Sequence, residues 1–191
     1  MRRIGLISDT HGKRHPRVAE IFTAEGVEAI VHAGDIGPGL LGAHILNELE
    51  SVAPVTVVSG NNDRDPIPGW PLNPVASLTV RVGEALRDGA GTTSEQAVVR
   101  ITAVHILGHI KPIEAGTHVV VSGHTHVASA VVDDRSGALC VNPGSTSRPR
   151  AGFPASVGIL DIDDERLVAG QPDSVLGAVS LRIINLNISE N

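Results

Sequence analysis

Carboxylate, imidazole and amide side chains gather in five short segments of this sequence, and each segment follows a short apolar run. Imidazole and carboxylate together suit the divalent metals Mn, Fe, Zn, Ni and Co, so the pattern indicates a metal site. The five segments are Asp9-Thr10-His11, Gly34-Asp35, Gly60-Asn61-Asn62-Asp63, His105 and Gly123-His124-Thr125-His126.

The spacing within two of these segments favours a shared target. Residues i and i+2 of an extended segment point to the same side, so Asp9 with His11, and His124 with His126, can each aim two ligands at one place. A carboxylate can bridge two cations about 3.5–4 Å apart, as in two-metal hydrolytic sites, where the pair activates a water and holds a phosphate. The pattern is therefore typical of a hydrolytic metal centre.

The apolar runs before these segments are expected to be strands that end at one edge of a sheet. Runs at 4–7, 29–31 and 55–58 alternate with helical spacing over 15–23 and 40–49. This order predicts a parallel sheet covered by helices. Ligands gather at the carboxyl ends of such strands, because the connecting loops converge there.

The second half of the chain is richer in strand patterns, with a Gly-rich hairpin connection expected over 83–94. We expect these strands to include antiparallel pairs and find no internal repeat or linker, so the sequence predicts one α/β domain over 1–191. The predicted strands of this half are 77–82, 98–104, 119–121, 129–133, 138–141, 156–162 and 179–188.

Composition excludes several classes of protein. The net charge of −6 (15 Lys and Arg against 21 Asp and Glu) and the three aromatic residues argue against an extended nucleic-acid surface. Cys140 is the single cysteine, so an intrachain disulfide and a thiolate zinc site are excluded. Since no apolar run suits a membrane helix or a signal peptide, we expect a cytoplasmic protein without membrane contact.

The five segments, in this order, resemble the successive motifs of the calcineurin-like metallophosphoesterases. Two later segments, Asn142-Pro143-Gly144-Ser145 and Arg148-Pro149-Arg150, are similar to the small bacterial and archaeal phosphodiesterases related to the retromer subunit Vps29. The resemblance covers about residues 3–162 and leaves a strand and tail over 163–191. It implies a four-layer α-β-β-α sandwich, in which two packed mixed sheets are flanked by helices.

The resemblance also implies two divalent cations, with manganese expected and Ni, Fe, Zn or Co as alternatives. A hydroxide bridging the cations would attack the phosphorus of a small phosphodiester or another phosphorylated substrate. One cation would be held by Asp9, His11 and His126, the other by Asn61, His105 and His124, with Asp35 bridging both. The residues expected to take part in catalysis are Asp35, Asn61, Asn62 and Asp63.

Two positions depart from the family pattern. Many relatives carry a histidine, usually assigned to the leaving group, where this chain has Asn62. An amide donates a hydrogen bond but no proton, so we expect slow turnover of esters with poor leaving groups. Asp63 either assists there or orients a ligand. Relatives read His-Gly-His where this chain has a longer segment from His105 to His109, so His109 is an alternative ligand to His105.

Other interpretations stay open at this point. A non-catalytic, Vps29-like protein-binding scaffold would keep the fold, although all seven ligand positions carry competent residues. The segment 37–42 formally matches a dinucleotide fingerprint, but five residues separate it from its strand. Arg148 and Arg150 either contact substrate phosphate or are solvated charges, and His32 is notable for its closeness to Asp35. The oligomeric state, a homo-oligomer included, is not determined by the sequence.

Overall fold

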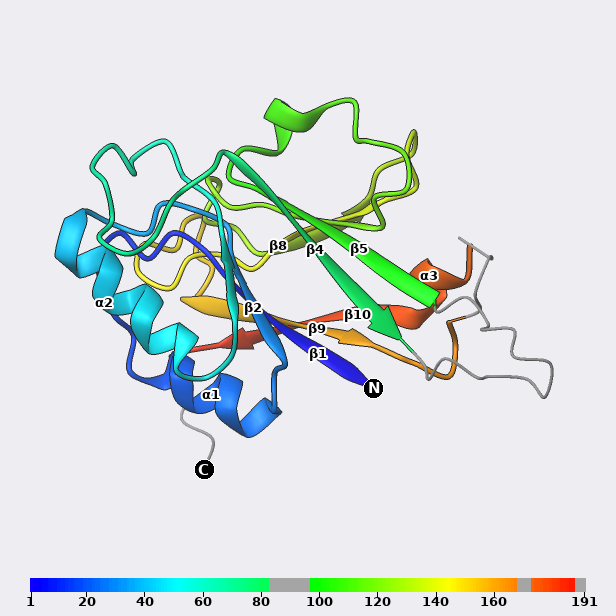
Figure 1. Ribbon diagram of the computed structural model, residues 1–191, viewed down its shortest axis with the longest axis horizontal. Coiled ribbons are helices and arrows are strands. Elements are labelled where there is room, and N and C mark those ends of the chain that lie inside the picture. Colours follow the sequence, from blue (N-terminus) through cyan, green and yellow to red (C-terminus); the bar gives the residue numbers. More distant parts are fainter. Residues whose placement is uncertain (83–96, 168–172, 188–191) are drawn as a thin grey trace.

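Two five-stranded mixed sheets stack face to face in the computed structural model, which describes residues 1–82, 97–167 and 173–187 (Figure 1). This arrangement confirms the α/β sandwich that the family resemblance implies. The hairpin connection expected over 83–94 lies outside the described residues. Among those described, no helix has the length and apolar character needed to cross a membrane.

The first sheet has the strand order β10-β9-β1-β2-β3. Its strands β1 (Arg2–Ile7), β2 (Ala29–His32) and β3 (Val55–Val57) run parallel, as the alternating pattern predicts. Two antiparallel strands, β9 (Ser156–Ile162) and β10 (Val179–Asn185), extend the sheet beyond β1. Every residue of β9 is buried, because both faces of the sheet are covered at this position.

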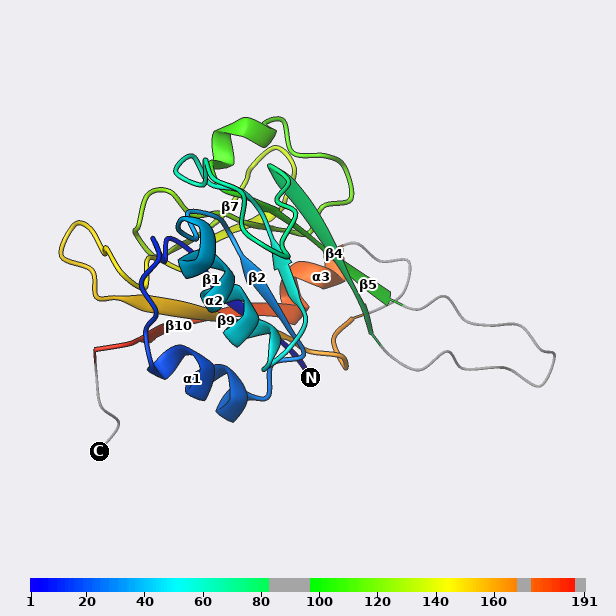
Figure 2. The same cartoon turned by 60° about the vertical axis from the view of Figure 1, so that its left-hand side comes forward.

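Helices α1 (Arg17–Glu25) and α2 (Gly39–Glu50) lie against the outer face of this sheet (Figure 2). Each turns an apolar stripe with a spacing of four residues toward the strands: Val18 and Phe22 in α1, and Ile45 and Leu49 in α2. They pack with buried strand residues such as Ile30 in one aliphatic cluster. Phe22 is the single aromatic ring of this cluster, as the low aromatic content leads one to expect.

The second sheet has the order β4-β5-β6-β8-β7. Its strands are β4 (Val75–Val82), β5 (Ala97–Val104), β6 (Val119–Val121), β7 (Ser129–Val132) and β8 (Leu139–Asn142). β5, β6 and β8 are parallel to one another, whereas β4 and β7 pair antiparallel at the two edges. Between the sheets lies a core of alternating strand residues, including Leu6, Val31, Ile101 and Val121, all at most 1% exposed.

The outer layer over the second sheet is thin in the described part of the chain. It consists of a 3₁₀ turn, η1 (Leu107–Ile110), and the loop after it, whose apolar side chains pack on Val104, Val120 and Cys140. A short helix, α3 (Asp173–Ala178), precedes β10 and has no counterpart among the expected elements. The sequence pattern missed it because six residues are too few to show a repeat of apolar residues at helical spacing.

The two sheets are joined where β1, β2, β5 and β6 end. Within each sheet the neighbouring loops are linked: the amide of Asp9 donates to the carbonyl of Gly34 in the first sheet, and the amide of Gly123 donates to the carbonyl of His105 in the second. The ring of His105 then reaches across to the first sheet, where Nδ1 lies 2.8 Å from the carbonyl oxygen of Ala33. Loops that are far apart in sequence therefore share one edge of the sandwich.

Candidate metal centre

An unusual backbone conformation marks five of the seven predicted ligands. Their φ angles are positive, a region that residues other than glycine rarely adopt and that costs about 1–3 kcal/mol for each residue. These residues are Asp9 (54°), His11 (47°), Asp35 (52°), His124 (68°) and His126 (61°). Such strain persists only where the surroundings hold the backbone in place, and it is concentrated at functional sites.

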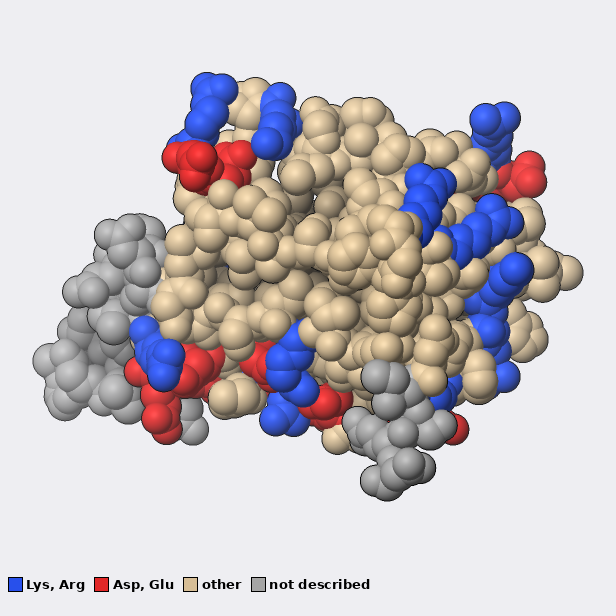
Figure 3. All heavy atoms as spheres, turned by 180° about the vertical axis from the view of Figure 1, so that it is seen from behind, with Lys and Arg blue, Asp and Glu red and all other residues tan. Residues whose placement is uncertain are grey.

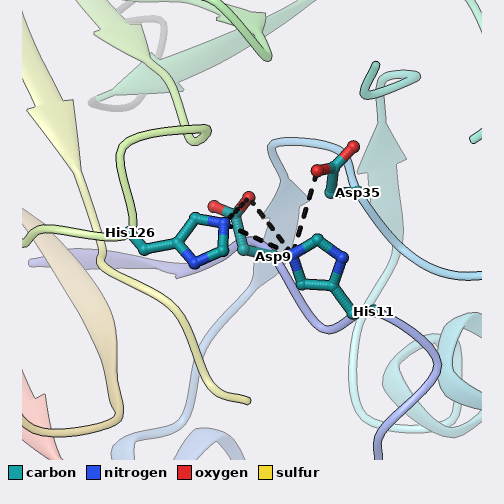
Figure 4. Close-up of side chains that lie close together, drawn as sticks. All are labelled: Asp9, His11, Asp35 and His126. Atoms are coloured by element: carbon teal, nitrogen blue, oxygen red, sulfur yellow. Dashed lines mark hydrogen bonds and ion pairs between the residues drawn. The ribbon is translucent and has the colours of Figure 1, made fainter. Parts of the chain in front are cut away.

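The first cluster contains Asp9, His11, Asp35 and His126, which converge as Figure 4 shows. One potential ligand atom from each lies within 4.8 Å of all the others. The Nε2 atoms of His11 and His126 are 3.3 Å apart, and Asp9 Oδ1 is 3.2 Å from His126 Nε2. Two imidazoles and two carboxylates facing one point form a donor set that suits a divalent transition metal.

The second cluster contains Asn61, His105 and His124, and Asp35 faces it as well. Asn61 Oδ1 lies 3.0 Å from His105 Nε2 and 2.9 Å from His124 Nδ1. Asp35 Oδ2 is 3.5 Å from His105 Nε2 and 3.8 Å from His11 Nε2. A single carboxylate oxygen therefore lies between the two clusters, which is where a bridging ligand belongs.

Backbone carbonyls orient two of the histidines toward the centre. His105 Nδ1 lies 2.8 Å from Ala33 O, and His126 Nδ1 lies 2.5 Å from Arg148 O. A nitrogen that faces a carbonyl oxygen must carry the proton, so Nε2 of each ring presents its lone pair to the cluster. This arrangement is the usual outer support of a metal-binding histidine.

Asp35 is held in its charged form by its neighbours. Burial opposes ionisation, but hydrogen bonds involving His105 and Asn62 outweigh it, so the pKa of Asp35 lies below its ordinary value. The amide N–H of Asn62 donates to Oδ1 at 2.9 Å, and its side chain donates to Oδ2 at 2.6 Å. The Asn62 side chain is thus turned to Asp35.

Asp63 connects the two loops that carry Asp35 and Asn61. Its Oδ1 accepts a hydrogen bond from the amide of Gly37 at 3.0 Å, and its Oδ2 accepts one from the amide of Gly60 at 2.8 Å. Both carboxylate oxygens are therefore used on the backbone. Of the two roles open to Asp63 from the sequence, this geometry favours orientation of ligands.

Sequence reasoning assigned no role to several residues that support Asp9. The hydroxyls of Ser145 and Ser147 donate to the carbonyl of Asp9 at 2.8 and 2.9 Å, and the Ser8 hydroxyl lies 2.7 Å from its Oδ2. Burial raises the pKa of the Asp9 carboxyl, and the Ser8 hydroxyl counteracts this. One sequence feature could have pointed to this support, the segment Asn142-Pro143-Gly144-Ser145, but in the sequence it served only as part of the family resemblance.

Close contacts explain the glycines of these loops. A Cβ built on Gly60 would lie 2.1 Å from Asp35 Oδ1, and one on Gly123 would lie 2.8 Å from Asp9 Oδ2. Close contacts also explain the glycines of the segment 37–42, which formally matches a dinucleotide fingerprint. A Cβ on Gly37 would lie 2.2 Å from the amide nitrogen of Gly12, and one on Gly42 would lie 2.5 Å from the Gly37 carbonyl. Packing thus accounts for these glycines without a nucleotide.

His32 is fully buried and bridges two ligand loops. Its Nδ1 accepts a hydrogen bond from the amide of Gly34 at 3.2 Å, so its Nε2 carries the proton and faces the hydroxyl of Thr10 at 3.1 Å. Thr10 in turn donates to the carbonyl of Ile36. Burial is the largest cause that lowers the pKa of His32 to about 3, so the ring is neutral.

We expect this neutral ring to make stability fall in acid. The unfolded chain takes up a proton at His32 near its ordinary pKa of 6.5 and the folded chain does so only near 3, so protonation below pH 6.5 favours unfolding. At pH 4.5 the expected loss in unfolding free energy from this residue is about 2–3 kcal/mol. Urea unfolding of the metal-free protein at pH 7 and pH 4.5 measures it, with His32→Gln compared to the parent.

His44 provides the control, because it is also a histidine but its side chain is exposed. The His44→Gln protein is expected to keep the parent's loss of stability between pH 7 and pH 4.5, whereas His32→Gln loses about 2–3 kcal/mol less. Equal losses in all three proteins would show that His32 is not kept neutral by the fold.

The structure separates the two candidate histidines of the segment 105–109. His105 is 3% exposed and lies in the second cluster, as described above. His109 lies on η1, is exposed, and has no side-chain contact with the centre within the described residues. The geometry therefore favours His105 as the ligand.

A cleft of about 320 Å³ opens above both clusters. It is lined by five of the predicted ligands, by Asn62 and by a cationic wall made of the segment 148–150: His11, Asp35, Asn61, His124, His126, Asn62, Arg148, Pro149 and Arg150. This volume is at the lower end of the range for small-molecule sites.

Comparison with known proteins adds a family and two curated relatives. The family described as calcineurin-like phosphoesterase superfamily domain matches residues 1–165. A probable metallophosphoesterase of Methanothermobacter thermautotrophicus is 37% identical over 172 residues, which cover 87% of this chain and 89% of the relative. The phosphodiesterase YfcE of Escherichia coli is 29% identical over 194 residues, which cover 95% of this chain and 99% of YfcE.

Solved structures show the same fold. The structure of E. coli YfcE, described as a phosphoesterase, aligns with a TM-score of 0.56 and 25% identity, covering 97% of this chain and all of the other. Vps29 of Entamoeba histolytica, solved as a complex with zinc, aligns with a TM-score of 0.58 over 97% of this chain and 99% of Vps29. Its identity of 17% extends the likeness to the fold alone.

Proposed function

The chain belongs to the calcineurin-like phosphoesterase superfamily and is a metal-dependent phosphoesterase, and we propose that it hydrolyses phosphodiesters at a binuclear centre. The observation that carries this proposal is the position of Asp35 Oδ2, which lies 3.8 Å from a histidine nitrogen of the first cluster and 3.5 Å from one of the second. Both distances allow one carboxylate to serve two cations.

The proposed ligands divide as the two clusters do. Asp9, His11 and His126 would hold one cation, Asn61, His105 and His124 would hold the other, and Asp35 would join both. We propose manganese first, with Ni, Fe, Zn and Co as alternatives, because nitrogen and oxygen donors of this mixture suit all five. When bound, two such cations would make a water nucleophilic toward phosphorus and would neutralise charge on the phosphoryl oxygens.

The residues of the chain contribute position and charge. Asp35 stays anionic because Asn62 donates hydrogen bonds to both of its carboxylate oxygens, and the carbonyls opposite His105 and His126 fix the tautomers that ligation requires. Asn62 and Asp63 act in this proposal through Asp35 and the neighbouring loops, as positioning residues. The cytoplasmic location expected from the sequence stays a prediction.

The experiment that tests the function measures hydrolysis of bis(4-nitrophenyl) phosphate after loading with Mn²⁺. We expect turnover that is lost on chelation and restored by Mn²⁺, because Asp35 and its neighbours provide ligands and no other nucleophile lines the described cleft. Fully loaded protein without turnover would contradict an enzyme and favour the protein-binding scaffold.

The same assay tests the leaving-group expectation. With no proton donor at Asn62, a methyl aryl phosphodiester should lose its aryl group readily, while a dialkyl phosphodiester should lack the ~10²–10⁴-fold help of a positioned acid and react more slowly by the full intrinsic difference in leaving group. The uncatalysed rates of the two esters give the intrinsic difference. An enzymatic aryl-to-alkyl rate ratio far below the uncatalysed ratio would show that another group protonates the leaving oxygen.

A further inference from the structure

The wall of the cleft carries two arginines that have no acidic partner in the described part of the chain. Five other arginines form ion pairs, for example Arg14 with Glu48 and Arg182 with Glu25 and Asp161. Within residues 1–82, 97–167 and 173–187, neither Arg148 nor Arg150 forms an ion pair or a side-chain hydrogen bond. Both side chains are exposed and line the cleft beside His11 and His126.

The backbone of this wall is fixed to a proposed metal ligand. The carbonyl of Arg148 accepts a hydrogen bond from His126 Nδ1, and the amide of Arg150 donates to the carbonyl of His126 at 3.4 Å. The amide of Arg148 also donates to the Ser145 hydroxyl at 2.9 Å. The two guanidinium groups therefore start from a backbone that is held in register with the centre, not from a free loop.

A count of the charges at the centre indicates what kind of group these arginines can bind. If two divalent cations occupy the centre, the charges of Asp9 and Asp35 leave a surplus of two positive charges. A hydroxide nucleophile and the single negative charge of a phosphodiester cancel that surplus. The charges of Arg148 and Arg150 then remain, which matches the two negative charges of a second phosphate group.

The uneven distribution of charge over the surface agrees with this balance. Figure 3, the view from behind, shows several Lys and Arg side chains gathered with few acidic ones on its right-hand side. That side corresponds to the left of Figure 1, where β1 and β2 end. The overall charge of −6 therefore does not describe this side of the molecule.

Resting on the proposed function, we propose that Arg148 and Arg150 form a subsite for a second phosphate group, and that the substrate is a phosphodiester that also carries a phosphomonoester. Guanidinium groups suit this task, because their planar N–H donors match two phosphate oxygens at once. The cleft volume of about 320 Å³ has room for a small molecule of this kind.

Equilibrium binding to the Mn²⁺-loaded protein tests the subsite without relying on turnover. By titration calorimetry, we expect propane-1,3-diol bisphosphate to bind at least about tenfold more tightly than propyl phosphate, since a charge-assisted pair adds to affinity. The double variant Arg148→Ala/Arg150→Ala should lose this preference and keep the manganese content of the parent. The substitution preserves the backbone bonds to His126 and Ser145.

Arg135 is the matched control, because it is also exposed and unpaired within the described residues but lines a different pocket with Lys111. Arg135→Ala should retain the tenfold preference. Equal affinity of the parent for both probes, or a preference that survives the double substitution, would overturn the subsite. If the preference is present but bis(4-nitrophenyl) phosphate is not hydrolysed, the proposed function fails while the subsite stands.

Discussion

Asp35→Asn is expected to lower kcat for bis(4-nitrophenyl) phosphate by about 10³-fold or more in the presence of saturating Mn²⁺. The substitution keeps the shape of the side chain and removes its negative charge. In the parent, Oδ2 of Asp35 faces both clusters, and Asn62 donates to both carboxylate oxygens. A carboxamide can accept from Asn62 with its oxygen, but its NH₂ group meets a donor where the second oxygen stood.

The manganese content, together with the spectrum, distinguishes loss of the bridging carboxylate from loss of the fold. We expect the parent to hold two manganese ions and Asp35→Asn to hold fewer at equal free metal, with an unchanged far-ultraviolet circular dichroism spectrum. Asp134→Asn is a matched control, because Asp134 is exposed in the turn between β7 and β8, away from the cleft. Full activity of Asp35→Asn would remove the basis for a shared carboxylate.

The arrangement of strands could be predicted from the sequence, because apolar runs and turn residues depend on local chemistry. The expected strands 119–121 and 156–162 coincide with β6 and β9, and the parallel order of β1, β2 and β3 is confirmed. Convergence of the loops then follows from topology, since the strands that precede them end at one edge. This is why donors spread over more than a hundred residues could be grouped before any coordinates were known.

The local geometry of the ligands could not be predicted in the same way. The spacing of Asp9 and His11 favoured an extended segment, whereas both residues have positive φ. They converge because the backbone of each loop is held by other loops: the amide of His11 donates to Asp35 O, and the amide of His124 donates to Asp9 Oδ2. Contacts of such sequence separation leave no local pattern.

The role of Asn62 shows a second limit. Its type excludes proton donation, which the sequence reveals, but its two hydrogen bonds to Asp35 depend on how two loops meet. His32 is a similar case, since a lone buried histidine gives no sign of the partners that it bridges. Gly34 is only two residues away, but Thr10 becomes a partner of His32 only when β1 and β2 pair.

His105→Ala is expected to remove one cation and to lower kcat/KM for bis(4-nitrophenyl) phosphate by at least about 10²-fold, while His109→Ala stays within about twofold of the parent. Loss of a hydrogen-bond partner that supports a metal ligand already lowers metal affinity or activity by about 10–100-fold, so loss of the ligand itself should lower it further. His105 Nε2 is 3.0 Å from Asn61 Oδ1 and 3.5 Å from Asp35 Oδ2, whereas His109 is exposed on η1. The measurement is manganese bound per chain together with the rate.

The pair of variants tests the division into two clusters as well as the choice of histidine. Because Asp9, His11 and His126 do not depend on His105 for their contacts with one another, His105→Ala should still bind one manganese ion. His126→Ala should likewise bind one, at the cluster of Asn61 and His124. Two variants that each lose one ion, from different clusters, require two separable sites joined by Asp35. If His105→Ala instead keeps both ions, or His109→Ala loses one, His105 is not the ligand that the geometry favours. His109 would then take its place in the second cluster.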